Sequence, residues 1–436
     1  MRPFKLSPAA ALVAVTLLVL GLSGLALPAA AETVALVGAT VHPMTGPAIA
    51  DATVLIVGDT IEAVGTDVAV PDGARRIDVG GKHVYPGMIH PLTNLGLVEI
   101  GSVRGTVDLR EVGDNNSDLR AEVAFNADSL RLPTATAGGV THALIFQSGG
   151  LFSGTSAVMR LQGWNWQDMA LQTNTGLHLW FPSTPEDEDD DESSAKADEA
   201  KEAMKALDES FARAAAYQKA KRAGTADLGV NPKLERLVQV LSGELRLIVH
   251  TRNRADIKAA LDWLAENELT NAVLVVGYEA RYVADKLAEA GFPVILNGVL
   301  ALPRKSWEPY DAVYGAAAVL HEAGVRFCIG DGGGSFGSAN ARNLPFEAAM
   351  ATAFGPDADV ALRAITSETA SILGIDDRVG SLEAGKEASL MVTDGNPLET
   401  LTNIESVWVA GRQVDPNQNH QYRLYQKYWN RPKPAD

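Results

Sequence analysis

Three side chains that can bind a metal ion follow apolar, strand-like runs of this sequence. His90 and His250 each come at the end of such a run, and Asp331 comes directly after residues 327–330. Imidazole and carboxylate groups are ligands of zinc-like ions, and a catalytic ion of this kind needs three protein ligands and one open position. Such an ion lowers the pKa of its bound water, which makes that water a nucleophile at neutral pH. The three residues are therefore candidate ligands of a mononuclear site for a divalent, zinc-like ion that activates water.

Two further histidines lie inside strand-like runs. His142 comes early in the run 140–146, and His178 alternates with Leu177 and Leu179. A lone histidine on a strand is more often a packed structural residue than a metal ligand. We interpret His142 as part of the core. For His178 two alternatives stay open, a place in the core and a place facing the interior that the strands enclose.

Two glycine-rich loops, 149–156 and 330–337, follow strand-like runs. The second contains G-x-G-x-x-G, but a dinucleotide site places this motif in the first βαβ unit, with an acidic residue about 20 positions later. No nucleotide cofactor is predicted for this reason. Glycine allows the backbone to approach a small ligand closely, although flexible connections without function remain the alternative. The predicted substrate-binding residues are Asn94, Gly150, Ser153, Gly277 and Gly333.

The elements that must position these residues alternate between strands and helices. Strand-like runs followed by loops and amphipathic stretches occupy residues 140–146, 177–181, 245–250, 272–276, 292–296 and 325–329. This alternation is typical of a parallel βα architecture. We predict an α/β fold with a (β/α)₈ TIM-like barrel over residues 85–379, in preference to an open doubly wound sheet. In such a barrel the loops after the strands gather at one end, where the candidate residues would meet.

The two ends of the mature chain read differently from its middle. Residues 32–84 and 380–415 contain short β-branched runs and turn signals, with too few strands at either end to bury a face alone. We predict that they form one small composite β-sandwich domain, followed by a C-terminal tail at 416–436. Residues 186–223 read as an insertion in the barrel. It begins with an acidic run, 186–192, which predicts a solvated, disordered loop in preference to a calcium site.

The second part of this insertion predicts an exposed helix over 194–222, with Ala203, Leu207, Phe211 and Ala214 on one face. At the N-terminus, residues 1–31 have the charged, apolar and small-residue order of a secretory signal, with an uncleaved anchor helix as the alternative. After cleavage no stable membrane insertion is expected.

The composition limits where the protein works and what it binds. The only cysteine is Cys328, so the chain forms no internal disulfide, which favours export to a Gram-negative periplasm. The net charge of -17 argues against binding to nucleic acid or to anionic membrane surfaces, because the electrostatic term has the wrong sign. The expected partner is a small molecule.

Several segments together resemble the amidohydrolase superfamily, and within it the imidazolonepropionase-like or prolidase-like periplasmic branch. Residues 84–94 are similar to a first-strand pattern Pro-Gly-apolar-Ile-Asp-x-His-x-His, and the block 343–375 continues into Gly380–Lys386 and Asp394–Pro397. The resemblance implies a (β/α)₈ barrel joined to a composite sheet domain. It also implies a metal-dependent hydrolase with its active site at the carboxyl ends of the barrel strands.

This chain departs from the family pattern in its metal ligands. Leu92 and Asn94 stand where the resemblance implies two histidines, His90 stands where it implies an aspartate, and Gly277 stands where a sixth-strand histidine is implied. His250 matches the fifth-strand histidine ligand.

Asp331 matches the eighth-strand aspartate, which implies both a metal ligand and the general base. The sequence thus supports two functions of different classes. The first is a hydrolase that acts on a carbon–nitrogen bond of a small amide, cyclic amide or dipeptide by metal-activated water, with an incomplete metal site. The second is a catalytically inactive binding or partner subunit that retains the fold and forms a homo-oligomer or pairs with an intact relative.

Overall fold

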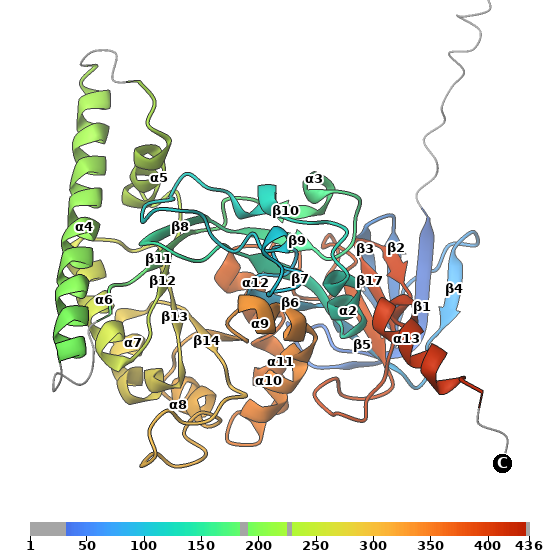
Figure 1. The fold of residues 1–436 in the computed structure, drawn as a ribbon. Helices are drawn as coiled ribbons and strands as arrows, with labels where there is room; N and C mark the ends of the chain where they lie inside the picture. Colours follow the sequence, from blue (N-terminus) through green and yellow to red (C-terminus); the bar gives the residue numbers. More distant parts are fainter. Residues whose placement is uncertain (1–31, 184–190, 225–228, 433–436) are drawn as a thin grey trace, which may run out of the picture.

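The computed structural model describes residues 32–183, 191–224 and 229–432 of the chain. It is a mixed α/β protein, which confirms the predicted class. Parallel strands and their helices occupy the middle of the molecule (Figure 1), with a sheet built from both chain ends on one side and the long helix α4 on the other. The predicted signal sequence and most of the acidic run lie outside the described residues.

Seven strands of the middle region run parallel in two groups. β6 pairs with β7, and β11 to β15 pair with one another in chain order. β15 also packs against β6, so the strand order follows that of a barrel. These strands are β6 (Met88–Thr93), β7 (Val140–Ile145), β11 (Leu177–Trp180), β12 (Leu247–His250), β13 (Ala272–Val276), β14 (Val294–Asn297) and β15 (Phe327–Gly330).

An antiparallel segment takes the place between β7 and β11. β9 (Ala157–Arg160) pairs antiparallel with β7, and β8 (Phe152–Thr155) pairs antiparallel with β11. The prediction of eight parallel units is therefore wrong at this position. Parallel neighbours need a crossover of a dozen or more residues, usually a helix, whereas residues 146–156 between β7 and its neighbour β9 contain only loop and β8, so the chain turns back on itself.

Alternate residues of the parallel strands enter two different cores. Ile248, Val273 and Ile295 lie in a cluster inside the strand layer, whereas Leu247, Leu274 and Leu296 pack outward against helices. Side chains of a strand alternate between its two faces, and a parallel sheet is covered on both. This double burial explains why these strands read as unbroken apolar runs. The inner cluster also contains Leu92, Leu144, Phe146, Val158, Val275 and Cys328.

Helices cover the outer face of the strands. The helix after β12, α6, begins at a cap in which the Asn253 side chain accepts a hydrogen bond from the Asp256 N–H, which satisfies a free donor of the first turn. The helices of this layer are α2 (Arg131–Ala137), α5 (Pro232–Leu241), α6 (Arg254–Glu266), α7 (Ala284–Ala290), α8 (Ala316–Glu322), α10 (Leu344–Thr352), α11 (Ala358–Arg363) and α12 (Ser367–Leu373).

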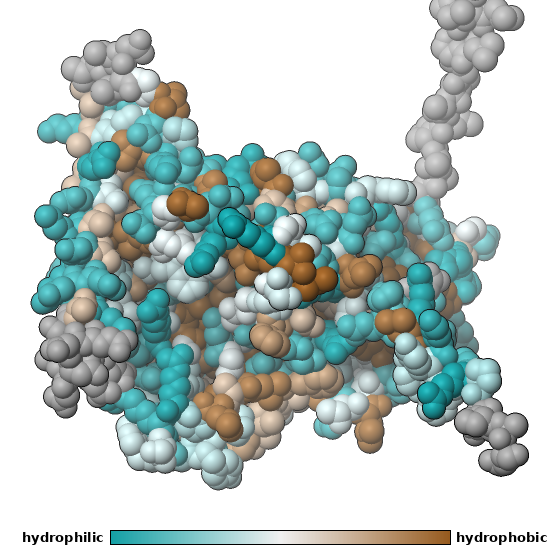
Figure 2. Space-filling view, in the orientation of Figure 1, coloured by the Kyte–Doolittle hydropathy of each residue, from teal (hydrophilic) through white to brown (hydrophobic). Residues whose placement is uncertain are grey.

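The insertion contributes the long helix α4 (Asp191–Arg222), which stands beside α5 and α6 (Figure 1). Leu207, Phe211 and Ala214 are buried, which confirms the predicted inner face, and Ala203 is half-buried. Figure 2 shows mostly hydrophilic side chains on the visible face of the molecule, including along α4. Within residues 32–432, as far as they are described, no helix combines the length and apolarity needed to cross a bilayer.

Both chain ends enter one hydrogen-bonded sheet of eight strands, in which β16 pairs antiparallel with β5. Gly411, with φ of 72°, turns this sheet where an added Cβ would lie 1.9 Å from the Gly58 carbonyl oxygen. The strands are β1 (Thr33–Val41), β2 (Ile49–Val57), β3 (Thr60–Gly65), β4 (Arg75–Asp78), β5 (His83–Pro86), β16 (Leu390–Thr393), β17 (Ile404–Val409) and β18 (Arg412–Val414). A short helix, α13 (His420–Trp429), follows.

Candidate functional site

Polar side chains of five parallel strands, or of the residues just after them, form the candidate site at the mouth of the barrel. They are His90 on β6, His178 on β11, His250 on β12, Asn297 on β14 and Asp331 after β15. The three histidines are buried, and Asn297 and Asp331 are half-buried. Parallel strands end at the same side of a barrel, which is why residues so far apart in sequence converge.

The structure brings His90 and Asp331 together. His90 Nε2 lies 3.2 Å from Asp331 Oδ1, with the histidine side chain fully buried and the aspartate side chain 9% exposed. The Leu92 N–H donates to His90 Nδ1 at 3.4 Å, which favours the tautomer with its proton on Nε2, toward the aspartate. The second oxygen of Asp331, Oδ2, has no hydrogen-bond partner among the described residues.

His250 lies against His178 instead of joining this pair. The His178 Nδ1 to His250 Nε2 distance is 2.8 Å, so one ring donates a hydrogen bond and the other accepts it. Burial lowers the pKa of His250 to about 3, and burial together with the neighbouring ring holds the pKa of His178 well below its ordinary value. Both imidazoles are therefore neutral across the physiological range.

Two aromatic rings enclose this histidine pair. Phe146 stacks on His178 and His250 with ring centroids 5.0 and 5.5 Å apart, and Trp180 stacks on His250 at 4.1 Å. Phe146 also belongs to the inner apolar cluster with Leu92. An apolar group thus packs on both imidazoles at the point where the barrel opens.

Asn94 and Gly333, both predicted to bind substrate, meet at this mouth. The Asn94 side-chain amide donates to the Phe146 carbonyl oxygen at 2.5 Å, and its oxygen accepts a hydrogen bond from the Gly334 N–H. A Cβ added to Gly333 would lie 2.7 Å from the Asn94 oxygen, so only glycine fits there. Asn94 therefore ties the loop after β15 to the loop after β7.

The other predicted substrate-binding residues lie around the mouth without converging on one point. Gly150 lines a cavity of about 890 Å³ formed by residues 101–113 and the loop after β7. Ser153 Oγ accepts a hydrogen bond from Trp180 Nε1 at 3.2 Å, behind the histidine pair. Gly277 caps the turn after β13 and faces open space.

Sequence reasoning missed Asn297 and Glu347. Burial, with the charge of Asp331 adding to it, raises the pKa of Glu347 to about 7, although the Leu300 N–H that donates to its carboxylate at 2.7 Å opposes the rise. The charges of both Asp331 and His90 act on this carboxyl group. Glu347 lies in the block that resembles the superfamily, but no spacing in the sequence singled it out.

The residues at the mouth do not fit a zinc-like ion with three protein ligands. Among the described residues, no three His, Cys, Asp or Glu side chains are arranged to hold a metal ion. The predicted ligand set of His90, His250 and Asp331 is therefore not assembled, because His250 pairs with His178 and stacks between aromatic rings. His90 and Asp331 remain as a pair, one donor short of the usual minimum.

His142 lies in the core, as the sequence indicated, and belongs to a buried network at the junction of the barrel and the end sheet. Its Nδ1 contacts the Thr141 hydroxyl at 3.0 Å and its Nε2 lies 3.1 Å from the Glu387 carboxylate. Arg160 holds the other oxygen of Glu387 at 2.7 Å. The Ser389 hydroxyl also donates to this carboxylate, so the network joins β7 and β9 to the start of β16.

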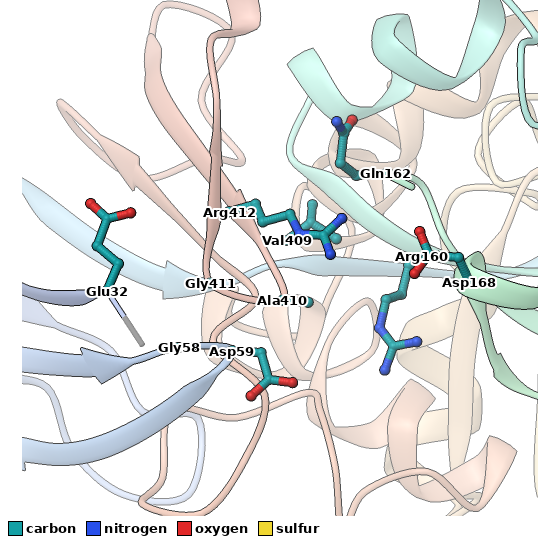
Figure 3. Close-up of a pocket in the computed structure, with 10 residues that line it drawn as sticks. All are labelled: Glu32, Gly58, Asp59, Arg160, Gln162, Asp168, Val409, Ala410, Gly411 and Arg412. Carbon is teal, nitrogen blue, oxygen red and sulfur yellow. The ribbon is translucent and has the colours of Figure 1, made fainter. Parts of the chain in front are cut away.

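A cavity of about 450 Å³ adjoins this junction, between the end sheet and β9 (Figure 3). Arg160 and Arg412 line it together with the carboxylates of Asp59 and Asp168. Arg160 is bonded to Glu387, and the remaining charges that line the cavity are of both signs. We therefore interpret this cavity as part of the junction.

Comparisons with known proteins agree with this arrangement of strands. Residues 270–414 match the model of a family described as the amidohydrolase family. Over 375 residues the chain is 24% identical to amidohydrolase tasK of Hapsidospora irregularis, which covers 78% of this chain and 37% of that protein. The chain thus spans little more than a third of that curated relative.

Two solved structures are similar over most of the chain. An amidohydrolase from Thermotoga maritima MSB8 is 25% identical with a TM-score of 0.76, covering 87% of this chain and 99% of that one. A prolidase solved with N-methylphosphonate-L-proline is 15% identical with a TM-score of 0.53, covering 88% of this chain and 100% of that one. The second likeness concerns the fold alone.

Proposed function

We propose that this chain, which matches the amidohydrolase family over residues 270–414, hydrolyses a carbon–nitrogen bond of a small amide, cyclic amide or dipeptide at the mouth of the barrel. The observation that carries this proposal is the buried contact between His90 Nε2 and Asp331 Oδ1 at 3.2 Å, beside the unpaired oxygen of Asp331. The names of two similar proteins, both amidohydrolases, support the reaction class.

The chain's own groups supply the proton transfers that hydrolysis requires. Asp331 Oδ2 accepts the proton of an attacking water, while His90 Nε2 lies beside the other carboxylate oxygen at 3.2 Å without forming a hydrogen bond to it. Glu347, with a pKa raised to about 7, is protonated in part of the molecules at neutral pH and can return a proton to the leaving nitrogen. No step in this scheme depends on a bound metal.

The loops after β6 and β7 enclose a cavity lined by Ser148, Gly149 and Gly150 on one side and by residues 101–113 on the other. The Ser148 N–H donates to the Leu109 carbonyl oxygen at 2.7 Å, which fixes the two loops together. We also propose that the protein works in the periplasm, on the strength of the residue order in 1–31.

Turnover of amide substrates by an Asp331→Asn variant tests the reaction. The purified chain is assayed for released amine with dipeptides, cyclic dipeptides and N-acyl amino acids. Asp331→Asn is expected to lower turnover by about 10²–10⁴-fold, the usual contribution of a general base. The matched control is Asp262→Asn on the exposed face of α6, which should leave turnover unchanged. Equal turnover by wild type and Asp331→Asn would overturn the assigned role.

A non-catalytic binding or partner subunit is the second candidate, favoured by the packing of Phe146 on both His178 and His250. In that case the same compounds would raise the melting temperature without being hydrolysed. The mass of the protein in solution, alone and with an intact relative, separates a homo-oligomer from a mixed pair. Hydrolysis that depends on Asp331 would exclude this second candidate.

A further inference from the structure

We infer that the mouth of this barrel is a metal-free site, in which Leu92, Asn94 and Phe146 have replaced the environment that a divalent ion needs. The inference goes beyond the proposed function, since both hydrolysis by protein groups and binding without hydrolysis are compatible with it. Leu92, Asn94 and His250 carry this inference, because each is already packed or hydrogen-bonded within the protein.

Position 92 carries an apolar side chain. Leu92 is 1% exposed and packs in the inner apolar cluster with Phe146 and Ile248. It stands where the first-strand pattern has a histidine, so an apolar group takes the place of a donor. An ion beside it would lose hydration without gaining a ligand, which is costly for any divalent charge.

His178 and His250 are bonded to each other. His250 Nε2 is bonded to His178 Nδ1 at 2.8 Å, and the His250 ring lies between Phe146 and Trp180. To bind an ion through Nε2, His250 would have to give up the bond to His178. Turning its ring to do so would also break the stacking on Trp180, whose centroid is 4.1 Å away.

Asn94 forms hydrogen bonds within the protein through both its amide nitrogen and its oxygen. Its amide donates to the Phe146 carbonyl oxygen and its oxygen accepts from the Gly334 N–H. Position 94, the second histidine of the pattern, thus serves to hold two loops together. Among the described residues no three His, Cys, Asp or Glu side chains are arranged to hold an ion. His90 and Asp331 contact each other, but two ligands are too few for a stable zinc-like site.

Metal binding by the intact chain, measured with Zn²⁺ or Co²⁺ alone, tests this inference. The protein is stripped with a chelator, given one equivalent of the ion and desalted, and its metal content is determined. We expect less than about one tenth of an ion per chain, with no change in His250→Ala or Asp331→Asn. One retained ion per chain that is lost in His250→Ala would overturn the inference.

A gain of binding provides the complementary test. Leu92→His combined with Asn94→His adds two imidazoles beside His90 and Asp331, which raises the number of donors to four. This variant should retain about one Co²⁺ per chain and show the visible absorption of tetrahedral cobalt. The matched control, Leu92→Met with Asn94→Gln, perturbs the same packing without adding an imidazole and should retain none.

The two measurements remain decisive if the double variant fails to fold, because the wild-type stoichiometry stands without it. A folded double variant, by circular dichroism, that binds no cobalt would overturn the assignment of the loss to positions 92 and 94. These readouts do not involve turnover, so a failure here is distinguishable from a failure of the proposed hydrolysis.

Discussion

The barrel mouth and the junction with the end sheet both bury histidines and carboxylates, but they satisfy these groups differently. At the junction both nitrogens of His142 and both oxygens of Glu387 have partners. At the mouth, five of the eight buried polar side-chain atoms that lack a hydrogen-bond partner in the described residues come together. They are His90 Nε2, Thr93 Oγ1, His178 Nε2, Asn297 Oδ1 and Asp331 Oδ2.

This difference separates a structural network from a site. A buried polar atom without a partner costs about 1–3 kcal/mol, so a cluster of them is retained where a ligand or water completes the bonds. At the junction the polar atoms of His142 and Glu387 all have partners, and the network serves to hold two sheets together. The mouth retains several unpartnered polar atoms despite their cost in stability, as expected of a region selected for binding or chemistry.

Breaking the junction should have the largest effect on stability. In Glu387→Gln, Arg160 loses its ion pair and His142 loses its charged acceptor, although the side chain keeps its size. Removing one partner of a buried pair costs about 3–5 kcal/mol, which urea unfolding followed by circular dichroism would detect. The control is Glu405→Gln in the exposed pair with Lys82, expected to cost less than about 1 kcal/mol. Equal losses in the two variants would show that the junction is not the stronger contact.

The pH dependence of stability should separate the two regions. Burial would raise the pKa of Glu387, but the hydrogen bond and charge of His142, together with Arg160, outweigh it and hold this pKa well below 4.5. Its stabilisation is therefore present above pH 4.5 and is lost as the pH falls below that value. At the mouth, the pKa values of His178 and His250 are lowered from 6.5, so the unfolded chain binds more protons below pH 6.5.

Each of these two histidines should therefore lower the free energy of unfolding by about 1.4 kcal/mol per pH unit as the pH falls below 6.5. Glu347 acts in the opposite direction between pH 4.5 and 7, because its pKa is raised in the folded state. The net effect of these three groups is a loss of about 2 kcal/mol between pH 6.5 and 5. His42, whose pKa is lowered to about 4 chiefly by burial, adds a loss in the same direction. Urea unfolding over this range checks it, and Glu347→Gln should steepen the slope. A flat profile would mean that the mouth histidines are not buried as neutral groups.

The sequence predicted the positions of the strands better than the pairing of the strands and the contacts of their side chains. Apolar runs located the parallel strands because these strands are buried on both faces. The antiparallel return through β8 and β9 was missed, because the residue pattern of such short strands does not indicate whether they pair parallel or antiparallel. The sequence placed His90, His250 and Asp331 in one site, and the structure brings His90 and Asp331 into contact while His250 pairs with His178. The His178–His250 contact was not foreseen because it depends on the register of β11 against β12, where Trp180 lies opposite His250.

The smallest effect is expected from replacing a threonine by valine in each region. Because the substitution is the same, it compares the mouth and the junction directly. Thr93 at the mouth is fully buried, and its hydroxyl has no partner among the described residues. Thr141 at the junction is also fully buried, but its hydroxyl contacts His142 Nδ1 at 3.0 Å. Valine has nearly the shape of threonine without the hydroxyl, so each change removes one polar group and little volume.

Thr93→Val should therefore raise the free energy of unfolding by about 1 kcal/mol, because an unsatisfied buried hydroxyl is removed. Thr141→Val should lower it by about 1 kcal/mol, because the imidazole of His142 loses a partner. Urea unfolding of both variants at pH 7.5 measures the two signs directly. If Thr93→Val destabilises the protein as Thr141→Val does, the Thr93 hydroxyl is bonded in solution, and the contrast between an unsatisfied mouth and a satisfied junction fails at this position.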